Sequence, residues 1–254
     1  MATGRSFKNG STPTVVLVHG AFTDASSWTG VIAELQASGI PVTAAANPLR
    51  GPATDAAYLA GVVAAIDGPV LLVGHSYGGV VITLAAAQLG NVVGLVYVTA
   101  FALEAGESVL DVTGRFPDSL LGPALRSAVF RTGDGEEAVE LYLKDGQFPA
   151  VFAADLPERL TSVAAAAQRP IAAVAFEESS PAASWKTLPS WYVVATADQA
   201  IHPAAQRFMA QRAGSDTIEV DASHAIALSQ PAAVAGHIRT AATATQAVKH
   251  THPA

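Results

Sequence analysis

The segment PVLLVGHSYGGVVITLAAAQL, residues 69–89, decides the fold of this chain. It begins with Pro69–Val73, an aliphatic run typical of a strand that is buried on both faces. The chain turns within GHSYG and continues into an apolar stretch, which predicts a helix over Gly78–Leu89. The pattern G-x-S-x-G between a strand and a helix is the context in which a serine hydroxyl projects above the end of a sheet. Ser76 is therefore the candidate nucleophile.

The same alternation of buried strands and amphipathic helices extends on both sides of this segment. The further predicted strands are Thr14–Val18, Pro41–Ala46, Val92–Val98, Trp191–Ala195 and Thr217–Val220. The further predicted helices lie at about residues 28–35, 54–66, 203–213 and 231–242. Strands that alternate with helices indicate an α/β fold with a mostly parallel sheet and helices on both of its faces.

The alternation breaks between Leu103 and Trp185, where short helical patterns, glycine, proline and aromatic residues are mixed. We expect residues 104–185 to form an inserted helical lid, or cap, on a core made of residues 1–103 and 186–254. The tail from Thr243 shows no periodicity, and we expect it to be frayed.

Composition excludes several classes of protein. The formal net charge is -7 and no Lys/Arg cluster stands out, so nucleic acid is not an expected partner. There is no cysteine, which rules out disulfides and thiol catalysis, and the histidines lack metal-ligand spacing. The first residues contain no apolar stretch, and the longest apolar runs are too short to cross a bilayer. We expect a cytoplasmic enzyme with a small-molecule substrate and with no cofactor, metal or membrane partner; the oligomeric state stays open.

A serine nucleophile needs a base, and in this kind of fold the histidine comes last in the chain. The histidines after Ser76 are His202, His224, His237, His250 and His252. His224 follows a predicted strand through a short loop and is the candidate base. We interpret His202 as a surface or capping residue, His237 in the last helix as a solvated bystander, and the two histidines of the tail likewise.

The base in turn needs an acid that orients it. Asp198 follows the predicted strand Trp191–Ala195 at its carboxyl end, where such sites are built, and is the candidate acid. The alternatives are that Asp198 only caps the next helix and that Glu104, after the strand Val92–Val98, is the acid.

An oxyanion hole needs two backbone N–H donors. One is expected from Tyr77, which follows the nucleophile. The other is expected from Ala21, with Phe22 as the alternative, because Gly20 lets that loop approach closely. We expect the ring of His19 to hold the loop together rather than to take part in chemistry. The aromatic residues expected to offer apolar walls to a substrate are Phe22, Phe148, Phe152 and Trp185.

These motifs together resemble the α/β-hydrolase superfamily, and within it the small serine esterase branch with the plant methylesterases and hydroxynitrile lyases. The stretches that carry the resemblance are VLVHGAF, SSW, GHSYGG, ATADQAI and DASHAIALSQP. The resemblance covers nearly the whole chain except the expected lid and the tail. It implies a Ser76–His224–Asp198 triad with oxyanion donors at Ala21 and Tyr77.

The resemblance also has departures. The lyases carry a threonine where this chain has Ala21, and the lysine of their active site has no obvious counterpart here, which disfavours lyase chemistry. The nucleophile is serine rather than aspartate, which disfavours dehalogenase and epoxide hydrolase mechanisms. The resemblance implies hydrolysis of a carboxylic ester, lactone or thioester of a small apolar substrate through an acyl-enzyme. The alternatives are a perhydrolase- or haloperoxidase-like use of the same triad and a ligand receptor on a hydrolase fold.

Overall fold

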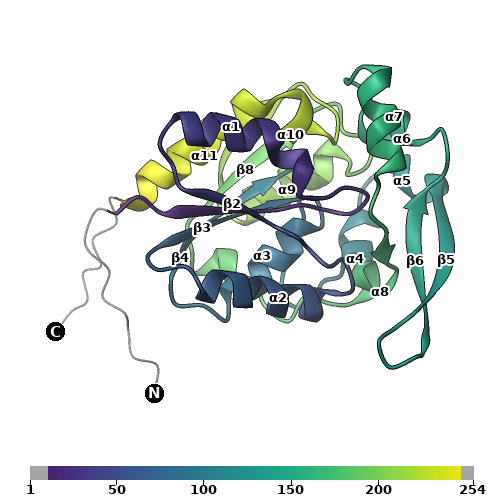
Figure 1. Ribbon diagram of the computed structural model, residues 1–254, viewed down its shortest axis with the longest axis horizontal. Helices are drawn as coiled ribbons and strands as arrows, with labels where there is room; N and C mark the ends of the chain where they lie inside the picture. Colours follow the sequence, from purple (N-terminus) through teal and green to yellow (C-terminus); the bar gives the residue numbers. More distant parts are fainter. Residues whose placement is uncertain (1–10, 247–254) are drawn as a thin grey trace.

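The computed structural model describes residues 11–246 of the chain. Its centre is a sheet of six strands in the order β2-β1-β3-β4-β8-β9, in which every neighbouring pair is parallel (Figure 1). The strands are β1 (Thr14–Val18), β2 (Val42–Ala45), β3 (Val70–His75), β4 (Val92–Val98), β8 (Ser190–Ala195) and β9 (Asp216–Val220). This confirms the predicted α/β-hydrolase architecture, and β2 is shorter than expected by one residue at each end.

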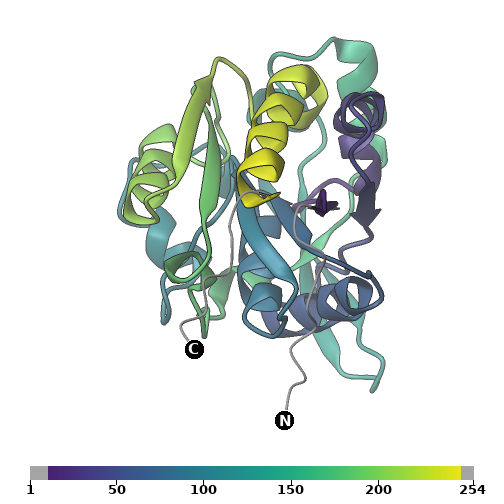
Figure 2. The same cartoon turned by 90° about the vertical axis from the view of Figure 1, so that its left-hand side faces the viewer.

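Helices cover both faces of this sheet (Figure 2). The elements of one face are η1 (Ala25–Trp28), α1 (Thr29–Ala37), α10 (Ile226–Ser229) and α11 (Pro231–Gln246). The elements of the other face are α2 (Pro52–Ala64), α3 (Gly78–Ala86) and α9 (Pro203–Arg212). Because both faces are covered, β3 and β8 are buried along their whole length, as their aliphatic sequences predict.

The predicted end of the last helix is wrong. We expected a frayed tail from Thr243, but α11 continues to Gln246. The reason is packing: Ala241 and Ala242 are buried, and Thr245 lies against Gly94 of β4. The sheet therefore stabilises a turn of helix that has no clear periodicity of its own. Residues 247–254, with His250 and His252, lie outside the described residues.

The segment between β4 and β8 contains helices, as expected, and also a second sheet that the expectation of a helical insertion did not include. Its helical elements are α4 (Val109–Thr113), α5 (Leu121–Ala124), α6 (Phe148–Phe152), α7 (Glu158–Ala166), α8 (Val174–Glu177) and η2 (Ser184–Lys186). Its strands are β5 (Leu125–Arg131), β6 (Glu137–Leu143) and β7 (Ile171–Ala172), which pair antiparallel. The hairpin of β5 and β6 extends along one side of the molecule (Figure 1).

The second sheet is anchored to the core through contacts from each of its three strands. Arg50 donates to Glu140 of β6 at 2.8 Å, and its guanidinium lies over the ring of Phe130 at 4.5 Å. The N–H of Ala172 in β7 donates to the carbonyl of Leu49 at 2.9 Å. These contacts hold the inserted segment against the loop between β2 and α2. In the described part of the chain, no helix is long and apolar enough to cross a membrane.

Candidate active site

Ser76 occupies a sharp turn between β3 and α3. Its φ is 54°, in the left-handed region that residues with a side chain rarely adopt. The turn closes so tightly that a Cβ on Gly74 would lie 2.5 Å from the carbonyl oxygen of Gly78. A Cβ on Gly78 would in turn lie 2.5 Å from the carbonyl oxygen of Val18, so glycine at both positions is a steric requirement. Ser76 stands two residues before the start of α3, near the positive end of that helix.

Asp198 and His224 are brought together from two neighbouring loops. Nδ1 of His224 donates to Oδ2 of Asp198 at 2.7 Å, and both side chains are buried. Asp198 follows β8 and His224 follows β9, and these two strands are adjacent and parallel. Their carboxyl ends therefore lie at the same edge of the sheet, which places an imidazole beside a carboxylate without water between them.

The carboxylate of Asp198 is held by several further donors. Oδ1 accepts from the N–H groups of Ala200 at 2.7 Å and Ile201 at 3.0 Å. Oδ2 also accepts from the amide of Gln206 at 2.8 Å and from the hydroxyl of Thr99. Burial alone would raise the pKa of Asp198, but the His224 ring and these donors outweigh burial and hold that pKa below its ordinary value. The carboxylate is therefore ionised and fixed, as an orienting acid needs to be.

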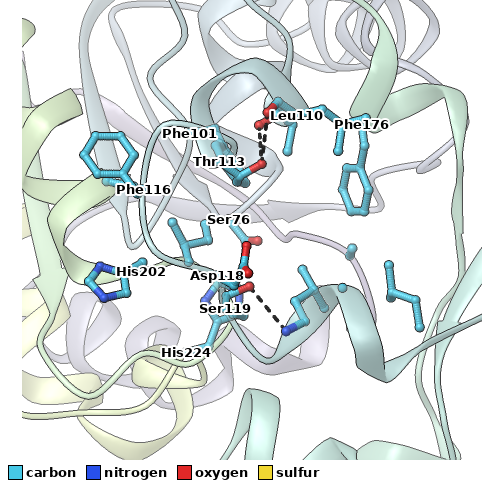
Figure 3. Close-up of a pocket in the computed structure, with 18 of the residues that line it drawn as sticks. Ser76, Phe101, Leu110, Thr113, Phe116, Asp118, Ser119, Phe176, His202 and His224 are labelled. Carbon is cyan, nitrogen blue, oxygen red and sulfur yellow. Dashed lines mark hydrogen bonds between the residues drawn. The ribbon is translucent and has the colours of Figure 1, made fainter.

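The cavity above the turn brings Ser76 and His224 into one lining (Figure 3). Its volume is about 520 Å³, within the range of small-molecule sites. Among the described residues that line it, none is Lys or Arg and the single carboxylate is Asp118. The remaining walls are mostly apolar, so the cavity suits an uncharged molecule with a large apolar surface.

The loop after β1 comes very close to Ser76. A Cβ on Gly20 would lie 2.6 Å from Cβ of Ser76, so only glycine allows this approach. The N–H of Phe22 donates to the carbonyl of Arg169 at 2.9 Å, and this contact engages the donor that we held as the alternative to Ala21. Ala21 lines the cavity, and Tyr77 directly precedes α3.

His19 holds this loop, as we expected from the sequence. Its Nδ1 donates to the carbonyl of Gly20 at 2.9 Å, and its Nε2 accepts from the N–H of Asn47 at 3.1 Å. The side-chain amide of Asn47 donates in turn to the carbonyl of His19 at 3.0 Å. Burial lowers the pKa of His19, so the ring is neutral and keeps the tautomer that this bonding needs.

Two of the four aromatic residues predicted to contact substrate line the cavity, and two do not. Phe22 and Phe152 are in the lining. Phe148 lies outside it and stacks behind Phe152, with ring centroids 5.0 Å apart. Trp185 is also outside the lining, and its indole N–H donates to the carbonyl of Leu103 at 2.9 Å. Both residues are buried packing groups, which an aromatic residue in an unassigned segment does not reveal by its sequence.

Sequence reasoning assigned no role to other residues of the lining. Three further aromatic side chains lie there, one from the loop after β4 and two from the inserted segment: Phe101, Phe116 and Phe176. The segment around α4 and α5 adds aliphatic side chains, among them Val109, Leu110 and Leu121. They lie in a stretch of mixed short helical patterns, whose sequence gave no signal of which side chains would face Ser76.

The remaining candidates have other partners. The carboxylate of Glu104 forms an ion pair with Lys186 at 2.7 Å rather than contacting His224. His202 caps α9 by accepting from the N–H of Ala204 at 3.2 Å, as expected, and it also lines the cavity. The prediction for His237 is wrong: the residue is buried, and Nε2 donates to the carbonyl of Asp216 at 3.0 Å. Within residues 11–246, no cluster of three or more His, Cys, Asp or Glu could hold a metal ion.

Comparisons with solved structures agree with this architecture. A pyrethroid hydrolase from Sphingobium faniae JZ-2 is 22% identical, with a TM-score of 0.73 over 92% of this chain and 98% of that one. Polyneuridine aldehyde esterase is 20% identical, with a TM-score of 0.77 over 91% of this chain and 99% of that one. A methylesterase, MES16 from Arabidopsis, is 17% identical, with a TM-score of 0.75 over 91% of this chain and 99% of that one. At these identities the likeness concerns the fold.

The sequence itself was compared in two ways. No curated protein matches the chain. The model of the alpha/beta hydrolase family, in contrast, matches residues 15–237. This range contains all three residues of the candidate triad, and it contains the whole central sheet apart from the first residue of β1. The chain therefore belongs to the alpha/beta hydrolase family.

Proposed function

We propose that this protein is a carboxylic ester hydrolase that uses Ser76 as nucleophile, His224 as general base and Asp198 as orienting acid. The observation that carries the proposal is the buried contact of 2.7 Å between His224 and Asp198, together with the joint position of His224 and Ser76 in one cavity. Because Nδ1 of His224 donates to an ionised carboxylate, Nε2 is the nitrogen left to accept a proton.

In the first half-reaction, the hydroxyl oxygen of Ser76 attacks the ester carbonyl while its proton passes to Nε2 of His224. The carbonyl oxygen becomes an oxyanion, which the N–H groups of Ala21 and Tyr77 stabilise. The engagement of the Phe22 N–H by Arg169 supports Ala21 as the donor from this loop. When the intermediate collapses, the C–O bond to the alcohol breaks, and the alcohol leaves with the proton from His224.

In the second half-reaction, water attacks the acyl-enzyme. His224 takes one proton of this water, and the other stays on the oxygen that becomes part of the product acid. Collapse breaks the bond between the acyl carbon and Oγ of Ser76, which recovers its proton from His224. Asp198 keeps its charge throughout, because the donors around it stabilise the carboxylate.

The cavity supports a neutral, largely apolar ester or lactone as substrate. Aromatic side chains such as Phe22, Phe101 and Phe152 offer apolar walls, and the described lining offers no cation to bind a free carboxylate. We propose that residues 104–185 act as a lid that supplies most of the cavity lining, while Phe22 and Phe101 belong to the core. Polyneuridine aldehyde esterase and the methylesterase, which share the fold, are esterases by name, and this supports an ester as the bond that is cleaved.

The test is a screen of chromogenic esters of increasing chain length with the wild-type chain and with Ser76→Ala. We expect wild-type turnover, and a loss of several orders of magnitude in kcat for Ser76→Ala because the nucleophile is gone. A reagent that phosphonylates active-site serines should label wild type but not Ser76→Ala. Saturable ligand binding without turnover by the wild-type chain would contradict the proposal and support a receptor. Peroxide-dependent turnover without ester hydrolysis would point instead to perhydrolase-like chemistry.

A further inference from the structure

The loop that carries His224 is held by hydrogen bonds from the core on one side. The N–H of Ala197 donates to the carbonyl of Ala222 at 3.1 Å. Nε2 of His75 donates to the carbonyl of His224 itself at 2.9 Å. Both contacts come from residues at the carboxyl edge of the central sheet.

The same loop is gripped from the inserted segment on its other side. The carboxylate of Asp155, between α6 and α7, accepts from the N–H of Ser223 at 3.1 Å with one oxygen and from the hydroxyl of Ser223 with the other. The carbonyl of Phe152 accepts from the N–H of Ala225 at 2.8 Å. The residues immediately before and after His224 are therefore both tied to residues 152–155.

The ring of Phe152 completes this contact. It meets the imidazole of His224 edge to face, with centroids 4.9 Å apart, and it lines the cavity. The carboxylate of Asp155 accepts two hydrogen bonds from Ser223, and it therefore fixes both the backbone and the side chain of that residue. Rotation of the backbone at Ser223 would swing the next residue, and with it the ring of His224.

We propose that Asp155 is a positioning residue for the catalytic histidine and that the inserted segment thereby aims the base as well as walling the cavity. The inference rests on the proposed function, since it concerns how well His224 reaches Ser76. Asp155 acts through Ser223 and touches neither the substrate nor the reacting atoms. Catalysis is sensitive to such aim, because a misplacement of about 1 Å costs on the order of 100-fold in rate.

The position of Asp155 makes the inference testable without breaking the fold. Asp155 is exposed as a whole, and only its carboxylate is partly covered. Truncating it removes two hydrogen bonds from the loop but leaves no hole in the hydrophobic core. Glu158, at the start of α7, is an exposed carboxylate three residues further along the same segment and serves as the matched control.

The experiment measures kcat and KM of the full chain on the best chromogenic ester for Asp155→Asn, Asp155→Ala, Ser223→Ala, the double variant Asp155→Ala/Ser223→Ala, and Glu158→Ala. We expect kcat to fall about 10- to 100-fold in Asp155→Ala, with KM within about twofold, because aim is lost and not substrate binding. Asp155→Asn keeps one acceptor oxygen and should fall between Asp155→Ala and wild type. Glu158→Ala should keep the wild-type kcat.

The double variant separates a specific contact from general damage. Ser223→Ala removes the hydroxyl that donates to Asp155 and that also lies 3.2 Å from the carbonyl of Phe152 and accepts from the N–H of Ala225 at 3.2 Å. The loss of kcat in the double variant should therefore be clearly smaller than the product of the two single losses. The rate at which the serine-directed phosphonylating reagent labels Ser76 should fall in parallel with kcat. If Asp155→Ala failed to fold, Ser223→Ala would test the same contact from the other side.

Two results would overturn the inference. One is a wild-type kcat in both Asp155→Ala and Ser223→Ala. The other is a pair of losses that multiply in the double variant, which would mean that the two residues act independently. Either result leaves the proposed function intact, because that proposal fails only when the wild-type chain itself does not turn over esters or when Ser76→Ala remains active.

Discussion

The imidazole of His75 donates its Nε2 proton to the backbone carbonyl of His224 at 2.9 Å, although the two residues are 149 positions apart in the chain. A carbonyl oxygen can only accept, so His75 carries its proton on Nε2. The two rings lie 4.7 Å apart between centroids, and Trp28 and Phe152 meet His75 edge to face. The residue before Ser76 thus supports the loop that carries His224, the proposed base.

This contact predicts how stability depends on pH. Burial lowers the pKa of His75 from 6.5 to about 3, and the neighbouring imidazole of His224 acts in the same direction. Below pH 6.5, His75 binds a proton in the unfolded chain but stays neutral in the folded chain. The contribution of His75 to the free energy of unfolding is therefore complete above pH 6.5 and is lost as the pH falls toward 3. We expect His75→Gln, which keeps a donor but does not titrate, to lose less stability between pH 7 and 5 than wild type. Urea unfolding at several pH values measures this, and equal slopes would contradict it.

Replacing the orienting acid should impair chemistry far more than replacing its rival. Asp198→Asn keeps the shape of the side chain but removes the charge that fixes the tautomer of His224, so we expect kcat to fall by about 10⁴-fold. Glu104→Gln breaks only an ion pair with Lys186 at the surface and should leave kcat within about twofold of wild type. Steady-state kinetics on one ester decides between them, and the reverse order would make Glu104 the acid.

The cavity predicts a change in chain-length preference. Leu110 of α4 lines the cavity and is 53% exposed, so Leu110→Trp can be accommodated but should narrow the space above Ser76. We expect kcat/KM for long-chain esters to drop about tenfold or more while short-chain esters are hydrolysed nearly as before. Leu160→Trp on α7, where the leucine is 45% exposed and outside the lining, is the control. An equal effect on all chain lengths would argue against this use of the cavity.

An ion-pair network ties the inserted segment to α9. One carboxylate oxygen of Glu107 accepts from Arg115 at 2.7 Å and from Arg212 at 2.8 Å. Burial would raise the pKa of Glu107, but these guanidinium groups and a backbone N–H outweigh it and hold that pKa at about 2. The contribution of the Glu107 carboxylate to the free energy of unfolding is therefore complete above pH 4.5 and is lost as the pH falls toward 2. Glu107→Gln should lower the melting temperature at pH 7 and reduce the difference between pH 7 and pH 4.

For that variant, the matched control is Glu137→Gln. Glu137 pairs with Arg131 at 3.4 Å on the exposed hairpin, where an ion pair contributes little. We expect its melting temperature to stay near that of wild type at both pH values. A similar loss in both variants would show that the network at Glu107 has no special weight.

The parts of the fold that the sequence could predict are those in which local chemistry and tertiary packing agree. A run such as Val70–Val73 is aliphatic because both faces of β3 are buried. Glycine is needed at position 74 because a Cβ there would collide with the carbonyl oxygen of Gly78. The pairing of Asp198 with His224 followed from their places after predicted strands, because parallel strands bring their carboxyl ends to one edge. Local patterns were enough in these cases.

The parts that could not be predicted depend on contacts between distant segments. Nothing near Phe148 distinguishes a ring that stacks behind Phe152 from one that faces the cavity. The strands β5 and β6 are short alternating runs within a segment of mixed patterns. Their pairing is stabilised by distant residues, namely β7, which pairs with β6, and Arg50, which donates to Glu140. The final turn of α11 is helical because Thr245 packs against β4, a partner roughly 150 residues earlier in the sequence.

The place where the inserted segment leaves the sheet has a consequence for exchanging it between related enzymes. Since β4 and β8 are parallel neighbours, the chain leaves the sheet at the carboxyl end of β4 and re-enters it at the amino end of the adjacent strand β8, and a foreign cap could be spliced between these two ends without altering the order of the strands. Such a chimera would acquire a new selectivity together with a loosened base, unless the graft also carried counterparts of Phe152 and Asp155. On the proposed roles, substrate selectivity and turnover rate would therefore have to be transferred together.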